Sequence, residues 1–471
     1  MTQIHNFTKY AVNYKTATRQ AMESLFQVNK TDNETFPPAE TELVKIHSIS
    51  PNNSVNQTTI KKNVTNNKAN TDSKILEAKT ISNQSVTSRE HSKSAISAQS
   101  VVTPSKDVKK PQSETSAYKV DPEKVAAMVR IVNNNIAFVT KHAQYYNEPI
   151  EELPLQTNGI IILTQNRSGS TFLGEIFDKH PDVFYNFEPL GFFDFGQKRH
   201  ADKVEVVRRN LKCDFPDIPS LYKTLDLHHR ALKTHCIVNN FCFRNHMRNL
   251  CGKEMCPFGN TNSCSGCGPV HLPRANHMCR KKKIAVAKLV RLRDIMPFKS
   301  IVEDPSYNLK FIHLIRDPRG IESSRLKLDR RLDVNHNSML TCGSQLRNGI
   351  AGFANTTDTQ WLKGRYYRIR YEDLAMDPFK YTEEIYKFAG LEFKQEIRNW
   401  IKLNTQQDPA QHSPWTTKRN STSTMEAWRK HLPFKTVSQI QQNCPKVLDL
   451  YGYKPVYNET QLHDFRFRLV V

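Results

Sequence analysis

Short apolar runs that suit buried strands alternate with helical patterns from about residue 159 to the end of the chain. A continuous apolar run is typical of a buried strand, and apolar residues recurring roughly every three to four positions are typical of a helix. The predicted strands cover residues 159–164, 284–290, 309–315 and 365–370, and the predicted helices cover residues 170–180, 320–331, 377–389, 393–403 and 435–450. This alternation indicates an α/β domain with a largely parallel sheet.

The N-terminal quarter of the chain has a different pattern, with few apolar positions and many Asn, Ser, Thr and Lys residues. We expect a disordered polar stalk over residues 1–118, because such a composition cannot bury a core. The stalk carries Asn-x-Ser/Thr sequons at Asn6, Asn29, Asn33, Asn52, Asn56, Asn63 and Asn83. They fit a luminal stalk, although an Asn-rich tract also produces sequons by chance. A helical stripe that begins near Asp121 predicts a leading helix and linker over residues 119–157, before a folded domain over residues 158–471.

The charge of the chain narrows the classes of partner. Its 68 Lys and Arg residues exceed its 46 Asp and Glu residues, which gives a formal net charge of +22. A field of that sign attracts polyanions such as nucleic acid, anionic membranes, sulfated glycans and phosphorylated cofactors. Nucleic acid is disfavoured as a partner, because neither a recognition module nor interleaved aromatic residues accompany the charge.

Signals for the secretory pathway are mixed. No apolar run approaches the roughly 18 to 20 residues of a transmembrane helix, and the start of the chain lacks the apolar centre of a signal peptide. Eight of the ten Cys residues nevertheless cluster in an insert over about residues 200–283, which reads as irregular. They are Cys213, Cys236, Cys242, Cys251, Cys256, Cys264, Cys267 and Cys279. The CxxC spacing of Cys264 and Cys267 is compatible with zinc, but the even count favours four disulfides in an oxidising compartment.

The most informative segment is a polar turn after the apolar run at residues 159–163. The turn reads Arg167-Ser168-Gly169-Ser170-Thr171 and leads into an amphipathic helix. Such a strand–turn–helix aims free backbone N–H groups and the positive helix end at an anion, and Arg167 adds a charged fork. No Lys precedes Ser170, so a nucleoside-triphosphate site of the Walker type is disfavoured. The alternative is an ordinary turn in which Ser170 caps the helix.

A second strand–turn has the same character. Arg316 stands at the C-terminal end of a predicted strand, and Ser324 follows eight residues later, inside the next predicted helix. Ligands of open parallel sheets bind at the carboxyl edge of the strands, so Arg316 and Ser324 could together hold another phosphate. The alternative is a plain turn, since Asp-Pro-Arg is a common turn sequence.

Four blocks of this sequence, in order, resemble the Golgi carbohydrate sulfotransferases. The branch is that of the 6-O-sulfotransferases acting on galactose, N-acetylglucosamine or N-acetylgalactosamine. The blocks are RSGSTFL at 167–173 with HPDVFY at 180–185 and FEPL at 187–190, RDPRG at 316–320 with SSR at 323–325, RYEDLA at 370–375, and NSTS at 420–423 with MEAWR at 425–429. The similarity covers roughly residues 158–455 and implies the sulfotransferase fold, a P-loop-like parallel sheet flanked by helices.

The resemblance implies the donor 3′-phosphoadenosine 5′-phosphosulfate and no metal. By that resemblance the 5′-phosphosulfate is held by Arg167, Ser168, Gly169, Ser170, Thr171 and Phe172, and the 3′-phosphate by Arg316 and Ser324. A loop closing over the nucleotide would contribute Arg419, Ser421, Ser423 and Arg429. Tyr371 is expected either to touch the adenine or to be a packed core residue.

Sulfuryl transfer also needs a base for the acceptor hydroxyl. We expect Glu188 to be that base, because it follows the turn by one helix and a short strand and so returns to the same crevice. The alternative is that Glu188 caps the turn before Pro189. Asp317 and Glu175 are weaker candidates, and Arg167 is expected to stabilise the leaving oxygen. Five basic residues could contact an anionic glycan or form a solvated face: Lys281, Lys282, Lys283, Arg291 and Arg293.

Together these features predict a carbohydrate sulfotransferase of the Golgi lumen that acts on a glycan or glycosaminoglycan. The hydroxyl is expected to be the 6-O position, with 4-O or 2-O sulfation as a rival. The family resemblance implies a type II membrane anchor, which is not visible in this chain, and leaves a homodimer open. A rival from another class is a non-catalytic binder of anionic glycans on the same fold. A nucleotide kinase is opposed by the missing Walker lysine.

Overall fold

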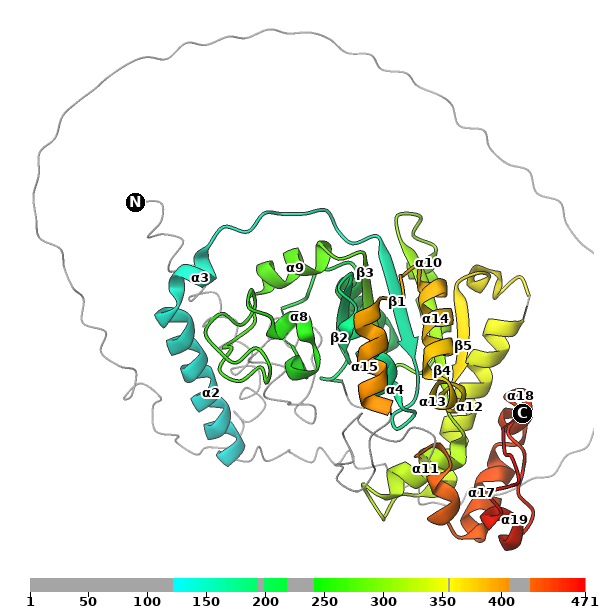
Figure 1. Cartoon of the computed structure of the whole chain (residues 1–471). Coiled ribbons are helices and arrows are strands. Elements are labelled where there is room, and N and C mark those ends of the chain that lie inside the picture. Colours follow the sequence, from blue (N-terminus) through cyan, green and yellow to red (C-terminus); the bar gives the residue numbers. More distant parts are fainter. Residues whose placement is uncertain (1–121, 194–198, 218–240, 355, 406–423, 471) are drawn as a thin grey trace, which may run out of the picture. The chain divides into compact units, whose positions relative to one another are not determined.

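The computed structural model describes residues 122–193, 199–217, 241–354, 356–405 and 424–470 (Figure 1). The predicted stalk over residues 1–118 lies outside the described residues, and the domain boundaries at 118 and 157 stay predictions. Among the described helices, none combines the length and the apolar character needed to cross a membrane.

A five-stranded sheet organises the described part of the chain. Its strands are β1 (Asn158–Leu163), β2 (Val183–Phe187), β3 (Ile284–Leu289), β4 (Asn308–Ile315) and β5 (Tyr366–Arg370), in the order β2-β3-β1-β4-β5. Every neighbouring pair is parallel, and at the centre Ile161 lies in register with Ala287 and Phe311. The apolar runs of β1 and β3 are buried along almost their whole length, and β4 is buried from Phe311 onward, as the centre of a parallel sheet covered on both faces requires. The predicted parallel α/β architecture is confirmed.

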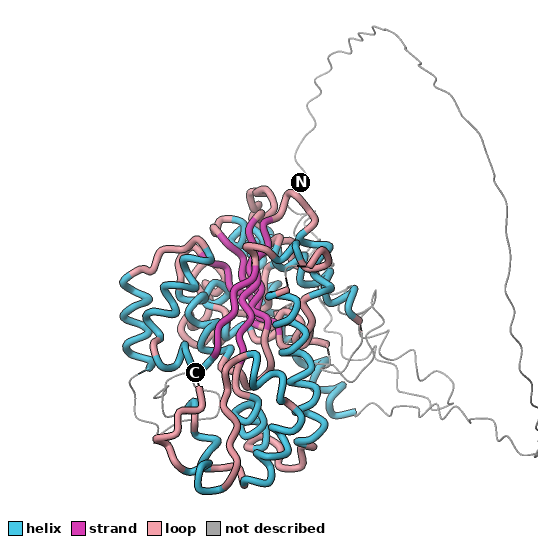
Figure 2. Tube along the Cα trace, turned by 90° about the vertical axis from the view of Figure 1, so that its right-hand side faces the viewer, coloured by secondary structure: helices cyan, strands magenta, loops and turns pink. Residues whose placement is uncertain are grey.

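Helices lie on both sides of the sheet (Figure 2). They include α4 (Ser170–Lys179), α11 (Pro318–Leu326), α12 (Val334–Phe353), α13 (Tyr371–Met376), α14 (Pro378–Ala389) and α15 (Gln395–Thr405). Near the C-terminus come α17 (Phe434–Asn443), α18 (Pro445–Leu450) and α19 (Glu459–His463). The single helix predicted over residues 435–450 is wrong, because Pro445 has no N–H to continue α17 and instead begins α18.

The Cys-rich insert is more regular than its sequence suggested. It contains α5 (His200–Leu211), α8 (Arg248–Cys251) and α9 (Leu272–Arg280), so the expectation of an irregular stretch is wrong at these places. Disulfides join Cys213 to Cys279, Cys251 to Cys264, and Cys256 to Cys267. Cys242 is also disulfide-bonded, whereas Cys236 lies outside the described residues. Because Cys264 and Cys267 belong to different disulfides, the CxxC spacing does not supply a pair of zinc ligands.

The leading helix packs against this insert. It forms α2 (Pro122–Lys141), followed by α3 (Ala143–Asn147). The Phe138 and Phe258 rings meet edge to face at 6.1 Å, and the Tyr146 hydroxyl donates a 2.9 Å hydrogen bond to the Pro269 carbonyl. Aromatic contacts of this kind fix the helix to the insert rather than to the sheet.

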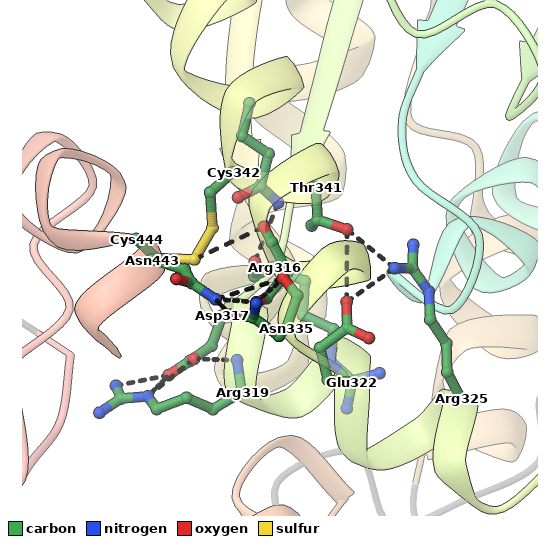
Figure 3. Close-up of a disulfide and its surroundings, with 12 residues drawn as sticks. Arg316, Asp317, Arg319, Glu322, Arg325, Asn335, Thr341, Cys342, Asn443 and Cys444 are labelled. Carbon is green, nitrogen blue, oxygen red and sulfur yellow. Dashed lines mark hydrogen bonds and ion pairs between the residues drawn. A yellow bond between two sulfur atoms is a disulfide. The ribbon is translucent and has the colours of Figure 1, made fainter. Parts of the chain in front are cut away.

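A second apolar cluster lies under the C-terminal helices, where Val437, Ile440, Val447 and Leu448 are buried. The sequence analysis did not assign α12, whose Cys342 forms a disulfide with Cys444 across 102 residues of chain (Figure 3). This bond ties α12 to the junction of α17 and α18, and so joins the C-terminal segment to the helix that packs beside α11.

Candidate active site at the carboxyl edge of the sheet

Residues far apart in the sequence lie on one side of the sheet, where the strands end. Because all five strands are parallel, their carboxyl ends share one edge of the sheet. Glu188 directly follows β2, Arg316 directly follows β4, and the turn at residues 164–169 follows β1. The edge therefore brings the predicted base and both predicted phosphate segments to the same side of the molecule.

The turn after β1 leaves the start of α4 open to an anion. Ser170 is the first residue of α4, and Gly169 before it has φ 83° and makes no side-chain cap. Ser170 is therefore not the capping residue that the plain-turn alternative requires. The Ser168 side chain is fully buried, yet its hydroxyl oxygen has no hydrogen-bond partner among the described residues. A buried hydroxyl without a partner beside an uncapped helix start suits a ligand oxygen.

Gly169 also sets how closely the turn approaches its neighbour. A Cβ atom at this position would lie 2.2 Å from the Tyr371 ring. The Tyr371 ring in turn stacks under the Arg316 guanidinium, whose central carbon lies 4.6 Å from the ring centre. Tyr371 is thus a packed support for the turn and for Arg316.

Direct hydrogen bonds join the two predicted phosphate segments. The Arg167 Nε donates to Ser324 Oγ at 3.0 Å, and an Arg316 Nη donates to the Arg167 carbonyl at 2.7 Å. Arg316 is buried and its Nε has no partner among the described residues. Two arginines and a serine therefore converge, with one N–H still to be satisfied, which fits a ligand carrying two separated anionic groups.

Buried ion pairs stabilise the two turns that carry Arg167 and Arg316. The Arg319 guanidinium donates to both carboxylate oxygens of Asp317, at 2.9 and 2.7 Å (Figure 3). The Arg325 guanidinium donates to the Glu322 carboxylate at 2.7 Å and to the Thr341 hydroxyl at 2.8 Å. The Arg325 Nε also donates to the Asn166 side chain at 3.0 Å, just before Arg167. Asp317 therefore braces its turn and is not placed as a free base.

The sequence analysis did not single out the Glu372 carboxyl, which lies next to Asp317. Glu372 accepts the Asp317 backbone N–H at 3.1 Å and the Tyr453 hydroxyl at 2.8 Å. Burial and the nearby Asp317 charge raise the pKa of Glu372 to about 7. The only sequence signal for Glu372 was its place in the RYEDLA block, since its partner Tyr453 is far along the chain.

Glu188 is held by two cations. Its carboxylate lies 3.1 Å from the Lys288 ammonium and 2.5 Å from the Arg291 guanidinium. Burial works to raise the pKa of Glu188, but the Lys288 and Arg291 charges outweigh it and hold that pKa below its usual value. Glu188 has a backbone φ of 48° and Arg167 has a φ of 70°, in a region that residues other than glycine rarely adopt. Such backbone strain gathers at functional sites.

Lys288 was missed in the sequence analysis. It lies within β3, is 1% exposed, and its ammonium stands 3.5 Å from the centre of the Phe187 ring. The available signal was a lysine inside an otherwise apolar strand, because a buried charge needs a partner.

The structure also places most of the remaining predicted residues. Phe172 is buried and stacks on Trp400 at 5.8 Å, Thr171 is partly exposed at the start of α4, and Glu175 lies in its second turn. Arg419, Ser421 and Ser423 lie outside the described residues. The Arg429 guanidinium is buried against four backbone carbonyls, those of Gln461, Leu462, Asp464 and Phe467, and so is committed to the C-terminal segment.

The basic residues proposed to contact the glycan do not act together. Lys281, Lys282 and Lys283 precede β3 and lie at the amino edge of the sheet, opposite the turn. The ammonium groups of Lys282 and Lys283 donate to the carbonyls of Pro181 and Gly390. Only Arg291 and Arg293, which follow β3, lie on the side of the candidate site.

Comparisons with known proteins agree with this geometry. Residues 157–452 match the sulfotransferase domain family. Carbohydrate sulfotransferase 1 of Mus musculus is 34% identical over 350 residues, which are 66% of this chain and 83% of that protein. Carbohydrate sulfotransferase 3 of Mus musculus is 29% identical over 363 residues, which are 69% of this chain and 75% of that protein.

Solved structures give weaker likenesses. The sulfotransferase domain from the Synechococcus PCC 7002 olefin synthase aligns with a TM-score of 0.33 and 19% identity, covering 63% of this chain and 96% of that one. The family match spans the turn, Glu188, Arg316 and Ser324 together. The chain therefore belongs to the sulfotransferase family, and it is a carbohydrate sulfotransferase that uses 3′-phosphoadenosine 5′-phosphosulfate as sulfuryl donor.

Proposed function

We propose that this enzyme transfers the sulfuryl group to the 6-hydroxyl of galactose, N-acetylglucosamine or N-acetylgalactosamine within a glycan or glycosaminoglycan. The observation that carries the proposal is the shared carboxyl edge, because the open start of α4, the Arg167–Arg316–Ser324 group and the Glu188 carboxylate all lie on that side of the sheet. A donor with two anionic ends and an acceptor that must lose a proton need these three features together.

The donor site is assigned mainly from two buried polar atoms, Ser168 Oγ and Arg316 Nε, for which the described residues supply no hydrogen-bond partner. Ser168 Oγ and the backbone at the start of α4 would hold the 5′-phosphosulfate, with Arg167 beside them. Arg316 and Ser324 would hold the 3′-phosphate, since the Arg316 Nε is buried and is not hydrogen-bonded by any residue that the structure describes. The bound donor supplies the sulfuryl group to be transferred. Because the arginines and backbone N–H groups carry the positive charge, we expect no requirement for a metal ion.

Glu188 would then accept the proton of the acceptor hydroxyl. The Glu188 carboxylate is kept ionised by Lys288 and Arg291, which is the state that a base requires. The same two cations make it a weak base, so it would take the acceptor proton as the new oxygen–sulfur bond forms. Arg167 would stabilise the charge on the leaving oxygen, because a guanidinium cannot donate its proton at neutral pH.

The Golgi lumen is the proposed location. Three described disulfides in the insert and a fourth between Cys342 and Cys444 suit an oxidising compartment. The relatives named as carbohydrate sulfotransferases support a carbohydrate acceptor, and the 6-O position is taken from the resemblance of the sequence blocks.

The test is transfer of ³⁵S from labelled donor by the purified full chain to chondroitin, keratan, heparan and simple galactose- or N-acetylglucosamine-terminated acceptors. We expect label in one acceptor class, at the 6-position after disaccharide analysis, and a loss of label in Arg167→Ala. Label at the 4- or 2-position would overturn the 6-O assignment. Donor binding without label in any acceptor would favour the non-catalytic binder of glycans.

A further inference from the structure

Helix α12 buries polar side chains and exposes apolar ones. Four of its large apolar residues are each about half exposed: Met339, Leu340, Ile350 and Phe353. Four polar residues, spaced so that they share one face of the helix, are at most 2% exposed and form what we call the polar stripe: Thr341, Ser344, Gln345 and Asn348. A surface helix normally does the reverse, so burial of apolar surface does not explain how α12 is turned.

Ser344 links the ends of two strands. Its hydroxyl accepts a hydrogen bond from the Gln165 side-chain amide at 2.9 Å and donates one to the Arg293 carbonyl at 2.7 Å. Gln165 lies two residues before Arg167, and Arg293 lies two residues after Arg291. One hydroxyl therefore joins the turn that carries a donor arginine to the segment that carries a cation beside the proposed base.

Gln345 contacts the end of a third strand. Its amide Nε2 donates a 3.0 Å hydrogen bond to the backbone carbonyl of Arg316, directly after β4. One turn further along α12, Asn348 donates to the Arg293 carbonyl at 2.7 Å and accepts the Ile295 N–H at 3.0 Å. The polar stripe thus holds the segments that follow β1, β3 and β4 against one face of a single helix.

Thr341 extends the polar stripe to α11. Its hydroxyl accepts a hydrogen bond from the Arg325 guanidinium at 2.8 Å (Figure 3). The Arg325 Nε also donates to the Asn166 side chain at 3.0 Å, and Asn166 directly precedes Arg167. The turn after β1 is therefore connected to α12 at two places, through Gln165 and through Asn166.

These contacts are poor contributors to stability. The side-chain amide oxygens of Gln165 and Gln345 are buried and have no hydrogen-bond partner among the described residues. A buried amide oxygen without a donor costs free energy, which an apolar helix face would avoid. Departures of this kind from the usual packing are expected at functional sites, so the polar stripe is better explained by the placement of the strand ends.

The position of α12 is itself fixed from its other side. Cys342, within the same turn of helix as Thr341, is disulfide-bonded to Cys444, and the Tyr451 hydroxyl donates to the Gln345 carbonyl at 2.7 Å. A helix held in this way can serve as a rigid reference for the segments that it contacts.

We propose that Gln345 and Ser344 are positioning residues for sulfuryl transfer. Gln345 places Arg316 to bind the donor, and Ser344 sets the turn after β1 against the segment that orients Glu188. The inference rests on the donor site and base proposed above and deepens them, because it assigns their alignment to a helix that contains none of the proposed donor-binding residues.

The test separates donor affinity from the rate of transfer. Each full-length variant is titrated with 3′-phosphoadenosine 5′-phosphate by calorimetry and is then assayed for single-turnover ³⁵S transfer at saturating donor. Gln345→Met should weaken nucleotide binding about tenfold, because the Arg316 carbonyl loses its donor. Ser344→Ala should keep nucleotide affinity within about threefold but slow transfer about tenfold or more, because small misplacements of reacting groups reduce the rate strongly.

Ser338→Ala is the matched control. Ser338 is a second serine of α12 and is also fully buried, but its hydroxyl donates to the Asn335 carbonyl and accepts from the Asn443 amide. Ser338→Ala should lower the melting temperature about as much as Ser344→Ala and leave affinity and transfer rate within twofold of the parent values. Ser344→Ala removes a single oxygen atom, so it keeps the test valid if Gln345→Met perturbs folding.

A variant that behaves as Ser338→Ala does in both measurements would overturn the positioning role of its residue. Label at the 4- or 2-position would overturn the 6-O assignment, but the ratios between variants would still test the positioning roles. If no acceptor were labelled, the proposed transfer would fall while nucleotide affinity still decided the role of Gln345. Weaker binding by Gln345→Met than by Ser338→Ala would uphold that role, and equal binding would overturn it.

Discussion

The Lys288 ammonium lies 3.1 Å from the Glu188 carboxylate, at the point where β2 and β3 end side by side. Phe187 and Lys288 are register partners in the two strands, so the sheet itself sets this distance. Arg291, just after β3, holds the second carboxylate oxygen at 2.5 Å. The proposed base is thus oriented by two cations, one in β3 and one just after it, and its proton affinity depends on them.

Replacing Lys288 should therefore change the pH dependence of transfer. In Lys288→Met, Glu188 loses one of the charges that lower its pKa, so that pKa rises. A protonated Glu188 cannot accept a proton, so activity is lost as the pH falls through this pKa. The acidic limb of the kcat/KM profile should therefore move to higher pH in this variant.

The matched control for this variant is Lys310→Met. Lys310 also lies on a strand, and its ammonium contacts the Phe388 ring and the Phe388 carbonyl, away from Glu188. Its pH profile should match that of the parent enzyme. An acidic limb that stays in place in Lys288→Met would argue that Glu188 is not the group whose ionisation the profile reports.

A methyl group at Gly169 should damage donor binding. In Gly169→Ala the new Cβ would lie 2.2 Å from the Tyr371 ring, and the backbone would stay in the left-handed region. We expect the affinity for 3′-phosphoadenosine 5′-phosphate, measured by calorimetry, to fall at least tenfold. Gly390→Ala has a similar φ of 74° but no atom within 4 Å, so it should lower stability by about 1 kcal/mol without altering nucleotide binding. Equal nucleotide affinity in both variants would remove Gly169 from the donor site.

Much of this architecture could be predicted from the sequence, because the relevant signals are local. The apolar run before Arg167 and the turn after it specify a strand, a turn and a helix within some 20 residues. The Arg316 turn repeats the pattern, and parallel strands bring both turns to one edge. The division of the helix at Pro445 was equally local and was overlooked.

The rest depends on contacts between distant residues, which a single sequence does not reveal. The Lys288–Glu188 pair joins residues 100 positions apart, one in β3 and one directly after β2 (288 − 188 = 100). Cys342 and Cys444 stood outside the Cys-rich insert and gave no sign of being partners. The run of basic residues before β3 was assigned to the acceptor by charge alone, whereas strand direction places it at the opposite edge.

A substitution at Arg429 tests whether this residue has a structural role or binds the donor. Its guanidinium satisfies four backbone carbonyls and stacks 4.5 Å from the Phe465 ring. Arg429→Gln would leave buried carbonyls without donors and should lower the free energy of unfolding by about 3 kcal/mol. Donor affinity of the folded protein should stay within about twofold, since a remote loss of packing does not alter the donor contacts.

The control for Arg429 is Arg466→Gln, because the Arg466 side chain is 92% exposed and pairs only at the surface. Its unfolding free energy should stay within about 0.5 kcal/mol of the parent value. If Arg429→Gln instead weakened donor binding with an unchanged melting temperature, Arg429 would belong to the donor site, as the sequence resemblance implied.

The Cys342–Cys444 disulfide should contribute strongly to stability. It closes 102 residues of chain, and a crosslink over a loop of that size restricts the unfolded state by about 4 to 5 kcal/mol in the chain-entropy description. The double variant Cys342→Ser/Cys444→Ser should lose about 3 kcal/mol or more in urea unfolding without reductant. Removing the Cys251–Cys264 pair, which closes only 13 residues, should have a smaller effect. An unfolding midpoint unchanged by the first double variant would show that the bond does not form in the folded enzyme.

The most direct test of the central claim is single-turnover transfer by Glu188→Gln. Glutamine keeps the size of the side chain but cannot take a proton from the acceptor hydroxyl. We predict that its nucleotide affinity stays within about twofold of the parent value, while the rate of ³⁵S transfer from bound donor falls roughly 10²- to 10⁴-fold. Transfer at the parent rate by this variant would contradict the assignment of Glu188 as the base, and with it the mechanism proposed for this site.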